Sequence, residues 1–392
     1  MSWASIANNQ TVSLANLQDA VNNGVFTLKN AIPVSNKQTN KSEAEYYVNI
    51  DPISKANNEL VVKSNLVANN STTTTSTTIP PVSPQYAIAG TGSDIYTSNN
   101  NGGNWSVNAW FGLVAGINTE FVEINSTGQY MFVVGIPFST FLSNVAISSN
   151  YGNSFSFLFS TNARINGIAM SDNGQYLMYV TGGNSGNIAR SSDFGASWSF
   201  SSAPIPYSNW KSVAMSSSGQ YVTLVSLNSY IWVSSDYGVS YTAKTAYPAT
   251  NWAAVVMSSN GQYQVAGRDT IYRSTNYGST WTNVGAPVSN GYGALAMSGD
   301  GQHLLGLSYF RNLELYRSIN YGANWSTVTT IGSGGSGNWN CIAISPDGVT
   351  QLVGANGNVW PTNDMWRSTN SGANFNVVSG TNLGWNSVSI GN

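Results

Sequence analysis

The sequence predicts an all-β protein in which seven four-stranded sheets close into a disc, a seven-bladed β-propeller. Three observations predict this fold. One turn motif recurs seven times, a second motif alternates with it, and the two ends of the repeat array are incomplete in complementary ways. We expect the ring to span residues 86–392 and to follow a small, mainly helical N-terminal segment.

The first motif reads Ser-x-(Asp/Asn)-x-Gly-x-x-(Trp/Phe/Tyr). Its glycines lie 50, 43, 43, 40, 44 and 50 residues apart, the spacing of a four-stranded blade rather than of a helical repeat. An Asx side chain accepts nearby backbone N–H groups, the glycine supplies a positive φ, and the aromatic ring anchors the turn, so we expect a structural role. The Asp/Asn position is held by Asn100, Asn150, Asp193, Asp236, Asn276, Asn320 and Asn370.

The second motif is an apolar run that leads into a Gly-Gln turn, as in residues 210–216 followed by Gly219-Gln220-Tyr221. Each repeat therefore predicts an inner strand, a Gly-Gln turn, two further strands, the first motif and an outer strand. Residues 385–390 match an inner strand with no turn after it, whereas residues 85–90 match a second strand with no inner strand before it. We therefore expect the last strand to complete the first blade and close the ring.

The aromatic residues that open the inner strands recur at equivalent places near the expected axis, which favours packing over ligand binding. They are Phe121, Trp210, Trp252, Tyr292, Trp339 and Trp385.

Before the ring the sequence changes character. Residues 69–85 are rich in Thr and Ser and end in prolines, a composition typical of an extended linker. Residues 1–68 form a separate segment with too little apolar sequence for a stand-alone core, so we expect it to become ordered against a partner or in a homo-oligomer.

Two helices are predicted in this segment. Ser13 is a candidate N-cap for a turn that carries Leu14 and Leu17 on one face, and Gly24 ends it. Ser42 and Glu45 form a candidate capping box before two tyrosines, Tyr46 and Tyr47.

The composition excludes several classes of partner and site. Only 8% of the residues are charged and the net charge is -2, without a Lys/Arg run, so neither nucleic acid nor an anionic membrane is the expected partner. No apolar stretch reaches membrane-spanning length. Cys341 is the single cysteine and His303 the single histidine, so no disulfide forms within the chain and we expect neither a metal site nor a cofactor.

The abundance of Asn, Ser, Thr and Gly is common on exported and virion surface proteins, yet the first residues lack a secretory signal. A virion component that is made in the host cytoplasm and released by lysis would explain both observations. We therefore expect the protein at a virion surface.

The first motif resembles the Asp box, or BNR repeat, of sialidases, sortilin-type receptors, xyloglucan hydrolases and photosystem assembly factors. The sequences of residues 8–13 and 17–24 resemble those of N-terminal modules of phage structural proteins. These resemblances imply a propeller displayed on a virion, with residues 1–68 bound to other virion proteins.

The sialidase resemblance implies an arginine triad, a Tyr paired with Glu, and an acidic residue. The early Arg motif of that family is missing here. The arginines that precede the boxes sit at one repeat position on four blades and cannot converge on one ligand: Arg190, Arg273, Arg317 and Arg367. We therefore predict no catalytic residues and a protein that is not an enzyme.

Binding residues are expected on the face that carries the second-to-third hairpins and the links between blades, because loop lengths vary there. The aromatic candidates are Phe138, Phe141, Tyr207, Tyr247, Tyr309, Phe310 and Trp360. Acidic residues near the third strands form an arc over contiguous blades, and Glu120 extends it into blade 2. The arc is interpreted either as solvated carboxylates or as a site for a cation or glycan hydroxyls. They are Asp94, Glu120, Asp269, Glu314 and Asp364.

The sequence thus predicts a non-enzymatic phage virion surface protein, of the head or tail fibre or decoration type. Its propeller would bind a host glycan or surface receptor, and several copies would add avidity. Two alternatives stay open: a sialidase-like or xyloglucanase-like glycoside hydrolase that uses the acidic arc, and a purely architectural virion protein.

Overall fold

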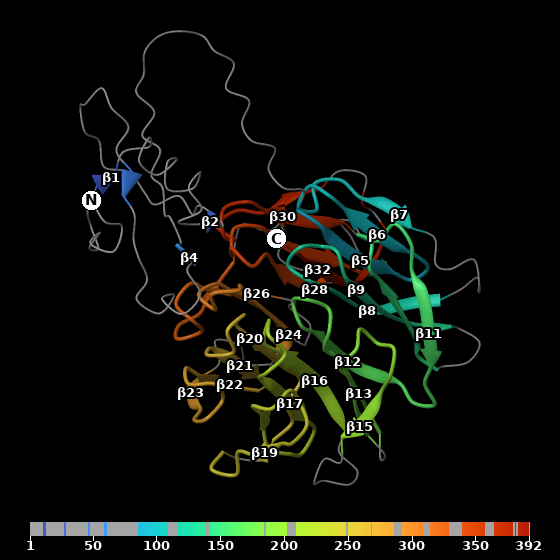
Figure 1. The fold of residues 1–392 in the computed structure, drawn as a ribbon. Coiled ribbons are helices and arrows are strands. Elements are labelled where there is room, and N and C mark those ends of the chain that lie inside the picture. The colour runs from blue at the N-terminus through green and yellow to red at the C-terminus, as the bar shows by residue number, and fades with distance from the viewer. Residues whose placement is uncertain are drawn as a thin grey trace. The chain divides into compact units, whose positions relative to one another are not determined.

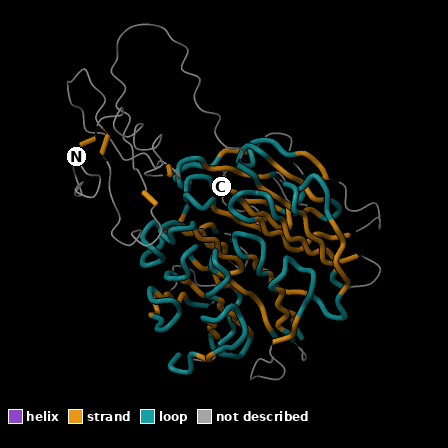
Figure 2. The backbone as a smooth tube through the Cα atoms, in the orientation of Figure 1, coloured by secondary structure: helices purple, strands orange, loops and turns teal. Residues whose placement is uncertain are grey.

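The protein is all-β throughout the residues that its computed structural model describes (Figure 1). These are residues 85–108, 117–137, 142–183, 186–201, 209–247, 250–267, 269–285, 292–308, 314–328, 339–356, 364–378, 381 and 383–391, together with the pairs 11–12, 27–28, 46–47 and 59–60. Figure 2 shows these ranges as strands and loops without a helix, and they therefore hold no helix that could cross a membrane. Contacts within the chain divide it into two units, Met1–Ile79 and Pro80–Asn392.

Seven antiparallel four-stranded sheets make up the second unit, which confirms the predicted seven-bladed propeller. Each sheet is one blade, and its strands are named from the inner to the outer one. Blade 1 contains β32 (Trp385–Ile390), β5 (Ala87–Thr91), β6 (Ile95–Ser98) and β7 (Ser106–Asn108). Blade 2 contains β8 (Ile117–Ile124), β9 (Met131–Pro137), β10 (Asn144–Ser148) and β11 (Ser156–Ser160). Blade 3 contains β12 (Ile165–Met170), β13 (Leu177–Thr181), β14 (Ile188–Ser191) and β15 (Ser199–Ser201).

The remaining four blades follow in chain order. Blade 4 contains β16 (Trp210–Met215), β17 (Val222–Ser226), β18 (Trp232–Ser234) and β19 (Thr242–Ala243). Blade 5 contains β20 (Ala254–Met257), β21 (Gln264–Gly267), β22 (Ile271–Ser274) and β23 (Thr282–Gly285). Blade 6 contains β24 (Tyr292–Met297), β25 (Leu304–Ser308), β26 (Leu315–Ser318) and β27 (Ser326–Thr327). Blade 7 contains β28 (Trp339–Ile344), β29 (Gln351–Ala355), β30 (Met365–Ser368) and β31 (Asn376–Val377).

The C-terminal strand closes the ring. β32 pairs antiparallel with β5, with Trp385 opposite Thr91 and Ile390 opposite Ala87. The Trp385 side chain is fully buried, and its indole N–H donates to the Thr381 carbonyl at 3.0 Å. The first blade is therefore built from both ends of the propeller sequence, as predicted.

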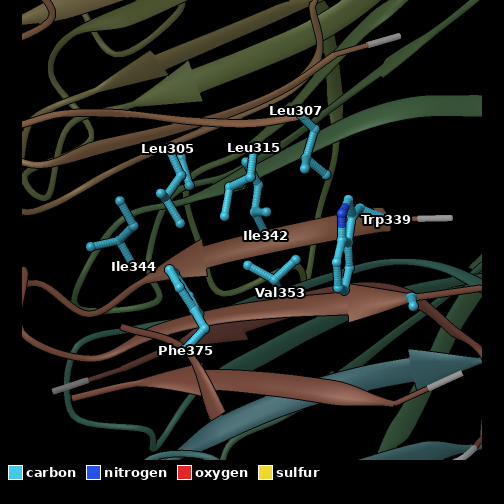
Figure 3. Close-up of a cluster of buried hydrophobic side chains, with 10 residues drawn as sticks. Leu305, Leu307, Leu315, Trp339, Ile342, Ile344, Val353 and Phe375 are labelled. Carbon is cyan, nitrogen blue, oxygen red and sulfur yellow. The ribbon is translucent and has the colours of Figure 1, made fainter. Parts of the chain in front are cut away.

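The core lies between the blades, because each strand alternates its side chains between the two neighbouring sheets. Figure 3 shows one such layer: Leu305 and Leu315 of blade 6 face Ile342 and Val353 of blade 7. All four side chains are at most 8% exposed. Apolar contact between blades therefore replaces a single central core.

The inner strands show why the predicted position of one aromatic residue, Phe121, at the start of an inner strand is wrong. Six of the described inner strands contain a bulge near their start. In five of them the residue before the bulge is large and apolar, such as Trp210, which is fully buried. In blade 2 the residue before the bulge is Thr119, and Phe121 is the residue after it. Phe121 therefore takes a position that other blades fill with small residues, such as Ser212 and Cys341.

The seven repeated turns, called box turns from here on, have the structural role that the sequence predicts. In each, the first Ser Oγ accepts the backbone N–H of the motif Gly at 2.9 to 3.1 Å. The Asp or Asn side chain accepts the N–H four residues further on at 2.8 to 3.0 Å. The motif residues therefore satisfy one another and are not available as a ligand site.

Adjacent blades are also joined by aromatic pairs. The Tyr that directly precedes a second strand packs against the aromatic residue just before the motif Gly of the next blade's box turn. The ring centroids are 4.4 to 5.6 Å apart in five successive pairs, from Tyr86–Tyr151 to Tyr263–Tyr321. Arginines add a second link: Arg190 Nε donates to the Tyr237 carbonyl at 2.6 Å, and Arg273 Nε donates to the Tyr321 carbonyl at 2.5 Å. These arginines hold neighbouring blades together, which agrees with their expected separation around the ring.

One of the two predicted N-terminal helices needs a correction. Tyr46–Tyr47 is a short strand, β3, that pairs antiparallel with β1 (Thr11–Val12). A second pair joins β2 (Thr27–Leu28) and β4 (Glu59–Leu60) in parallel. Two adjacent tyrosines favour extended backbone, and this preference outweighs the capping box before them. The rest of that helix, and the whole of the helix predicted from Ser13 to Gly24, lie outside the described residues.

Candidate site at the mouth of the central channel

The propeller has two distinct faces. The turns between first and second strands lie beside the box turns of the same blade, as shown by the Tyr237 N–H donating to the Gln220 carbonyl at 3.0 Å. We call this side the turn face. The opposite side, where the inner strands begin and where the second-to-third hairpins lie, is the link face. The two faces differ in sequence, because the turns repeat whereas the hairpins and links do not.

A cavity of about 540 Å³ runs along the inner strands of all seven blades. In five of the seven blades its wall changes from a polar to an apolar side chain along the inner strand. The second residue of the inner-strand motif lies at the link-face end and is polar in five blades: Glu120, Asn166, Lys211, Asn340 and Asn386. Further in, the wall is formed mainly by Val, Ile, Ala and Met. The cavity is therefore a channel with polar side chains at its mouth and mainly aliphatic side chains along the middle of its wall.

Side-chain amides form a hydrogen-bonded row across this mouth. Asn386 Nδ2 in blade 1 donates to Asn118 Oδ1 in blade 2 at 2.6 Å, although the residues are 268 positions apart in sequence. Asn356 Nδ2, just after β29 in blade 7, donates to Asn386 Oδ1. Asn118 Nδ2 makes a longer contact, 3.5 Å, with Glu120 Oε1. Ring closure is what brings these side chains together.

An ion pair ends the row in blade 3. Arg164 Nη2 lies 2.7 Å from Glu120 Oε1 and 2.9 Å from Oε2, and Arg164 Nε lies 3.1 Å from Oε2. The Glu120 side chain is 12% exposed and that of Arg164 is 63% exposed. This bidentate pair fixes the carboxylate more than it stabilises the fold. Asn356, Asn386, Asn118, Glu120 and Arg164 are called the amide row below.

Two further asparagines at the mouth bind backbone. Asn340 Nδ2 donates to the Trp385 carbonyl at 3.1 Å, and Asn166 Nδ2 donates to the Trp210 carbonyl at 2.8 Å. Each bond crosses from one blade to the next. Because inner strands use only one edge for pairing, such side chains satisfy carbonyls that face the channel.

Glu123 is the one acidic residue in the middle of the channel wall. The equivalent position in the other blades is Ala169, Ala214, Val256, Ala296, Ala343 or Ser389. Burial raises the pKa of the Glu123 carboxyl to about 7. Among the described residues no hydrogen bond or positive charge offsets this effect.

The turn-face end of the channel is ringed by backbone. The Asp172 N–H donates to Ser217, the Ser217 N–H to Ser259 and the Ser259 N–H to Gly299, each to a carbonyl oxygen 2.7 or 2.8 Å away. Asp172 Oδ1 accepts the Ser126 N–H at 2.7 Å. The polar groups of these peptide bonds are hydrogen-bonded to one another, so the amide row is the better candidate for ligand contacts.

Of the aromatic candidates from sequence, only Tyr247 is described, and it packs between strands. Its hydroxyl accepts the Trp281 N–H at 2.7 Å, and its ring lies 6.0 Å from that of Tyr272 in an edge-on arrangement. The remaining candidates lie outside the described residues: Phe138, Phe141, Tyr207, Tyr309, Phe310 and Trp360. Their contribution to binding stays a prediction.

The acidic arc does not gather around one point in the described ranges, where no group of three His, Cys, Asp or Glu side chains is placed to hold a metal ion. Glu314 accepts the hydroxyl of Tyr316, Asp94 accepts the hydroxyl of Ser93 at 2.6 Å, and Asp364 is 8% exposed. Asp269 is exposed. Only Glu120 belongs to the channel mouth.

Sequence reasoning missed most of the site. The partners of Asn386 are set by closure and by irregular hairpins, so no local signal identifies Asn118 or Asn356. Glu123 did have a signal, because it places a carboxyl where four other blades have Ala.

No protein-family model matches the chain, and no curated protein matches its sequence. Solved structures match its fold. A GH74 xyloglucanase from Xanthomonas campestris superposes with a TM-score of 0.55 at 15% identity over 79% of this chain and 52% of the enzyme, so the chain spans about half the enzyme's length. A functionally unknown protein from Desulfotomaculum acetoxidans gives 0.58 at 14% identity, covering 79% of this chain and 99% of that one. YCF48 bound to D1 peptide gives 0.50 at 13% identity, covering 77% and 88%.

The likeness to the xyloglucanase corrects one expectation. The sequence-based prediction that the protein is not an enzyme is overturned, because a propeller of this kind occurs in a glycoside hydrolase. The same fold also occurs in a propeller solved with a bound peptide. The fold alone therefore decides neither activity nor ligand.

Proposed function

We propose that the propeller binds a neutral glycan at the link-face mouth of its channel. The amide row carries this proposal. Carbohydrate hydroxyls both donate and accept hydrogen bonds, and an asparagine amide offers both kinds of partner. Asn386 uses one N–H and one lone pair within the row, which leaves a second donor and a second acceptor for a ligand.

The row is also held in place before any ligand arrives. Its amides bind one another across three blades, and the Arg164 guanidinium grips both oxygens of Glu120. Side chains that are already ordered lose little conformational entropy on binding. Neutral amides also cost less to desolvate than free charges. These properties favour an uncharged, hydroxyl-rich ligand.

The hairpins and links of the same face supply the other part of the proposed site. Phe138, Phe141, Tyr309, Phe310 and Trp360 belong to these segments and would offer rings on which sugars stack. The amide row would then fix the orientation of a sugar whose apolar face rests on one of these rings.

Replacing Asn386 by Ala should weaken binding of a neutral glycan about tenfold, because one or two hydrogen bonds of about 1 kcal/mol each are lost. A neutral-glycan array with the full-length chain identifies the ligand, and calorimetry then compares the variant with the parent. Asn99→Ala is the matched control, since Asn99 is exposed in the box turn of blade 1, on the turn face. Full affinity in Asn386→Ala, or no neutral glycan retained by the parent protein, would refute the proposal.

We further propose that this binding serves a phage particle, with residues 1–68 anchored to other virion proteins and residues 69–85 acting as a tether. Two features of the sequence support this proposal: the Thr/Ser-rich linker, and the resemblance of residues 8–13 and 17–24 to N-terminal modules of phage structural proteins. Deleting residues 1–68 should remove the protein from purified particles and leave the melting temperature of the propeller unchanged. Immunoblots of particles and thermal melts of the deleted protein provide the readouts; a truncated protein that still purifies with particles contradicts the anchor.

A further inference from the structure

We infer that the central channel is also a binding site for a small aliphatic amine, with the carboxylate of Glu123 as its counter-ion. This site lies deeper in the cavity whose mouth carries the amide row, and it does not depend on the proposed glycan. It combines a cavity of about 540 Å³, mainly aliphatic side chains along the middle of its wall, and one acidic side chain, Glu123, at that level. Cavities of this size and character are typical of sites for small organic ligands.

The position of Glu123 breaks the pattern of the channel wall. At this level the other six blades contribute uncharged side chains, four of them Ala. The small residues leave open space in front of the carboxyl, and their methyl groups offer apolar contact to the methylene chain of a ligand. An ammonium group would supply the positive charge that the wall lacks at this level.

The strands packed against β8 do not supply this charge. β9, β12, β32 and β5 carry no titratable side chain. Along β8 itself, Glu120 is already paired with Arg164. The carboxyl pKa of Glu123 is raised to about 7 by burial alone. A carboxylate in such surroundings gains more from an incoming cation than one in water does.

Three other titratable groups line the cavity. Asp172, at the turn-face end, accepts the Ser126 N–H. Cys341 is a buried thiol whose pKa burial raises to about 12, so it is uncharged at neutral pH. Lys211 lies at the link-face end, on β16. Lys211 adds positive charge near the entrance and should oppose entry of an amine.

The chemistry favours an amine over a metal ion. A metal would need several oxygen, nitrogen or sulfur ligands, and the described residues hold no group of three acidic, His or Cys side chains. One carboxylate and aliphatic walls instead match a single ammonium on a short hydrocarbon chain.

The test is a titration of the full chain with n-butylammonium, followed by calorimetry or by NMR of the ligand. We expect saturable binding at pH 8, at least tenfold weaker binding to Glu123→Gln, and no comparable binding of n-butanol. Because the ammonium requires ionised Glu123, affinity should fall about 90-fold from pH 8 to pH 5 if the free carboxyl has a pKa of about 7. Lys211→Gln should bind as tightly as the parent or more tightly.

Several outcomes would overturn the inference. These are equal binding of butanol and butylammonium, undiminished binding to Glu123→Gln, or no binding of butylammonium at millimolar concentrations by a folded protein. Asn99→Ala, on the turn face and outside the cavity lining, is the control and should leave amine binding unchanged. The inference rests on Glu123 and the cavity, so failure of the glycan experiment has no bearing on it.

Discussion

Ending the chain at Gly384, and so deleting residues 385–392, should prevent the propeller from folding. The deletion removes β32, whose residues Trp385, Val388 and Ile390 are buried between blades 7 and 1. Loss of a single buried Trp costs about 3–5 kcal/mol, and a whole domain is stable by only about 5–15 kcal/mol. The deletion also leaves the inner edge of β5 unpaired. We expect loss of the cooperative thermal transition in circular dichroism, together with aggregation.

A graded series makes this result easier to interpret. Trp385→Ala alone should lower the free energy of unfolding by several kcal/mol, within the range for buried aromatics. Val377→Ala, on the outer strand β31 where the side chain is 48% exposed, should have little effect. A shortened protein that melts at the parent temperature would mean that the last strand does not complete blade 1.

Replacing Glu123 by Gln should stabilise the protein at pH 8 and change little at pH 4. The Glu123 pKa is about 7 in the folded protein, above the ordinary 4.5 that applies to the unfolded chain. Below pH 4.5 the carboxyl is protonated in both states and costs nothing. Between pH 4.5 and 7 the unfolded chain ionises this carboxyl while the folded protein keeps it protonated, so the folded state loses stability, by up to about 3 kcal/mol above pH 7. Partial access of water to the channel lowers this figure, so a gain of about 1–3 kcal/mol is expected.

Urea denaturation of parent and variant at pH 4, 6 and 8 measures this difference. The parent should lose stability relative to Glu123→Gln as the pH rises, with most of the change between pH 5 and 7. Glu120→Gln is the matched control, because Glu120 lies at the mouth and is paired with Arg164. A constant difference between parent and Glu123→Gln across this pH range would show that the carboxyl is well solvated.

The repeat made the propeller predictable in detail. Glycine and Ser positions in the box turns recur because each turn needs the same hydrogen bonds, and the incomplete repeats at residues 85–90 and 385–390 predicted the closure. Local exceptions were harder. Thr119 holds in blade 2 the register that Trp210 holds in blade 4, and Phe121 lies two residues later, after the bulge. A bulge has no signature in sequence spacing alone, so this register was not predictable.

The sequence predicted the face of the propeller on which the candidate site lies, but not how its residues come together. Loop variability pointed to the link face, and Glu120 was among the candidates, but its neighbours Asn118 and Asn386 meet through a contact across 268 residues. Tyr247 was chosen as a loop aromatic, yet its hydroxyl accepts a backbone N–H from blade 5, so its ring packs between strands. Non-local pairing of this kind follows from the closed ring and not from any local pattern.

Closure of the ring is the claim on which the fold and the proposed glycan site both depend, because it places Asn386 beside Asn118. Hydrogen exchange of the amides in residues 385–390 tests it most directly. β32 pairs with β5 along one edge, so the amides that donate across this edge should exchange only when the whole propeller unfolds. Exchange of all these amides within seconds, at the rate of an unstructured peptide, would contradict the account.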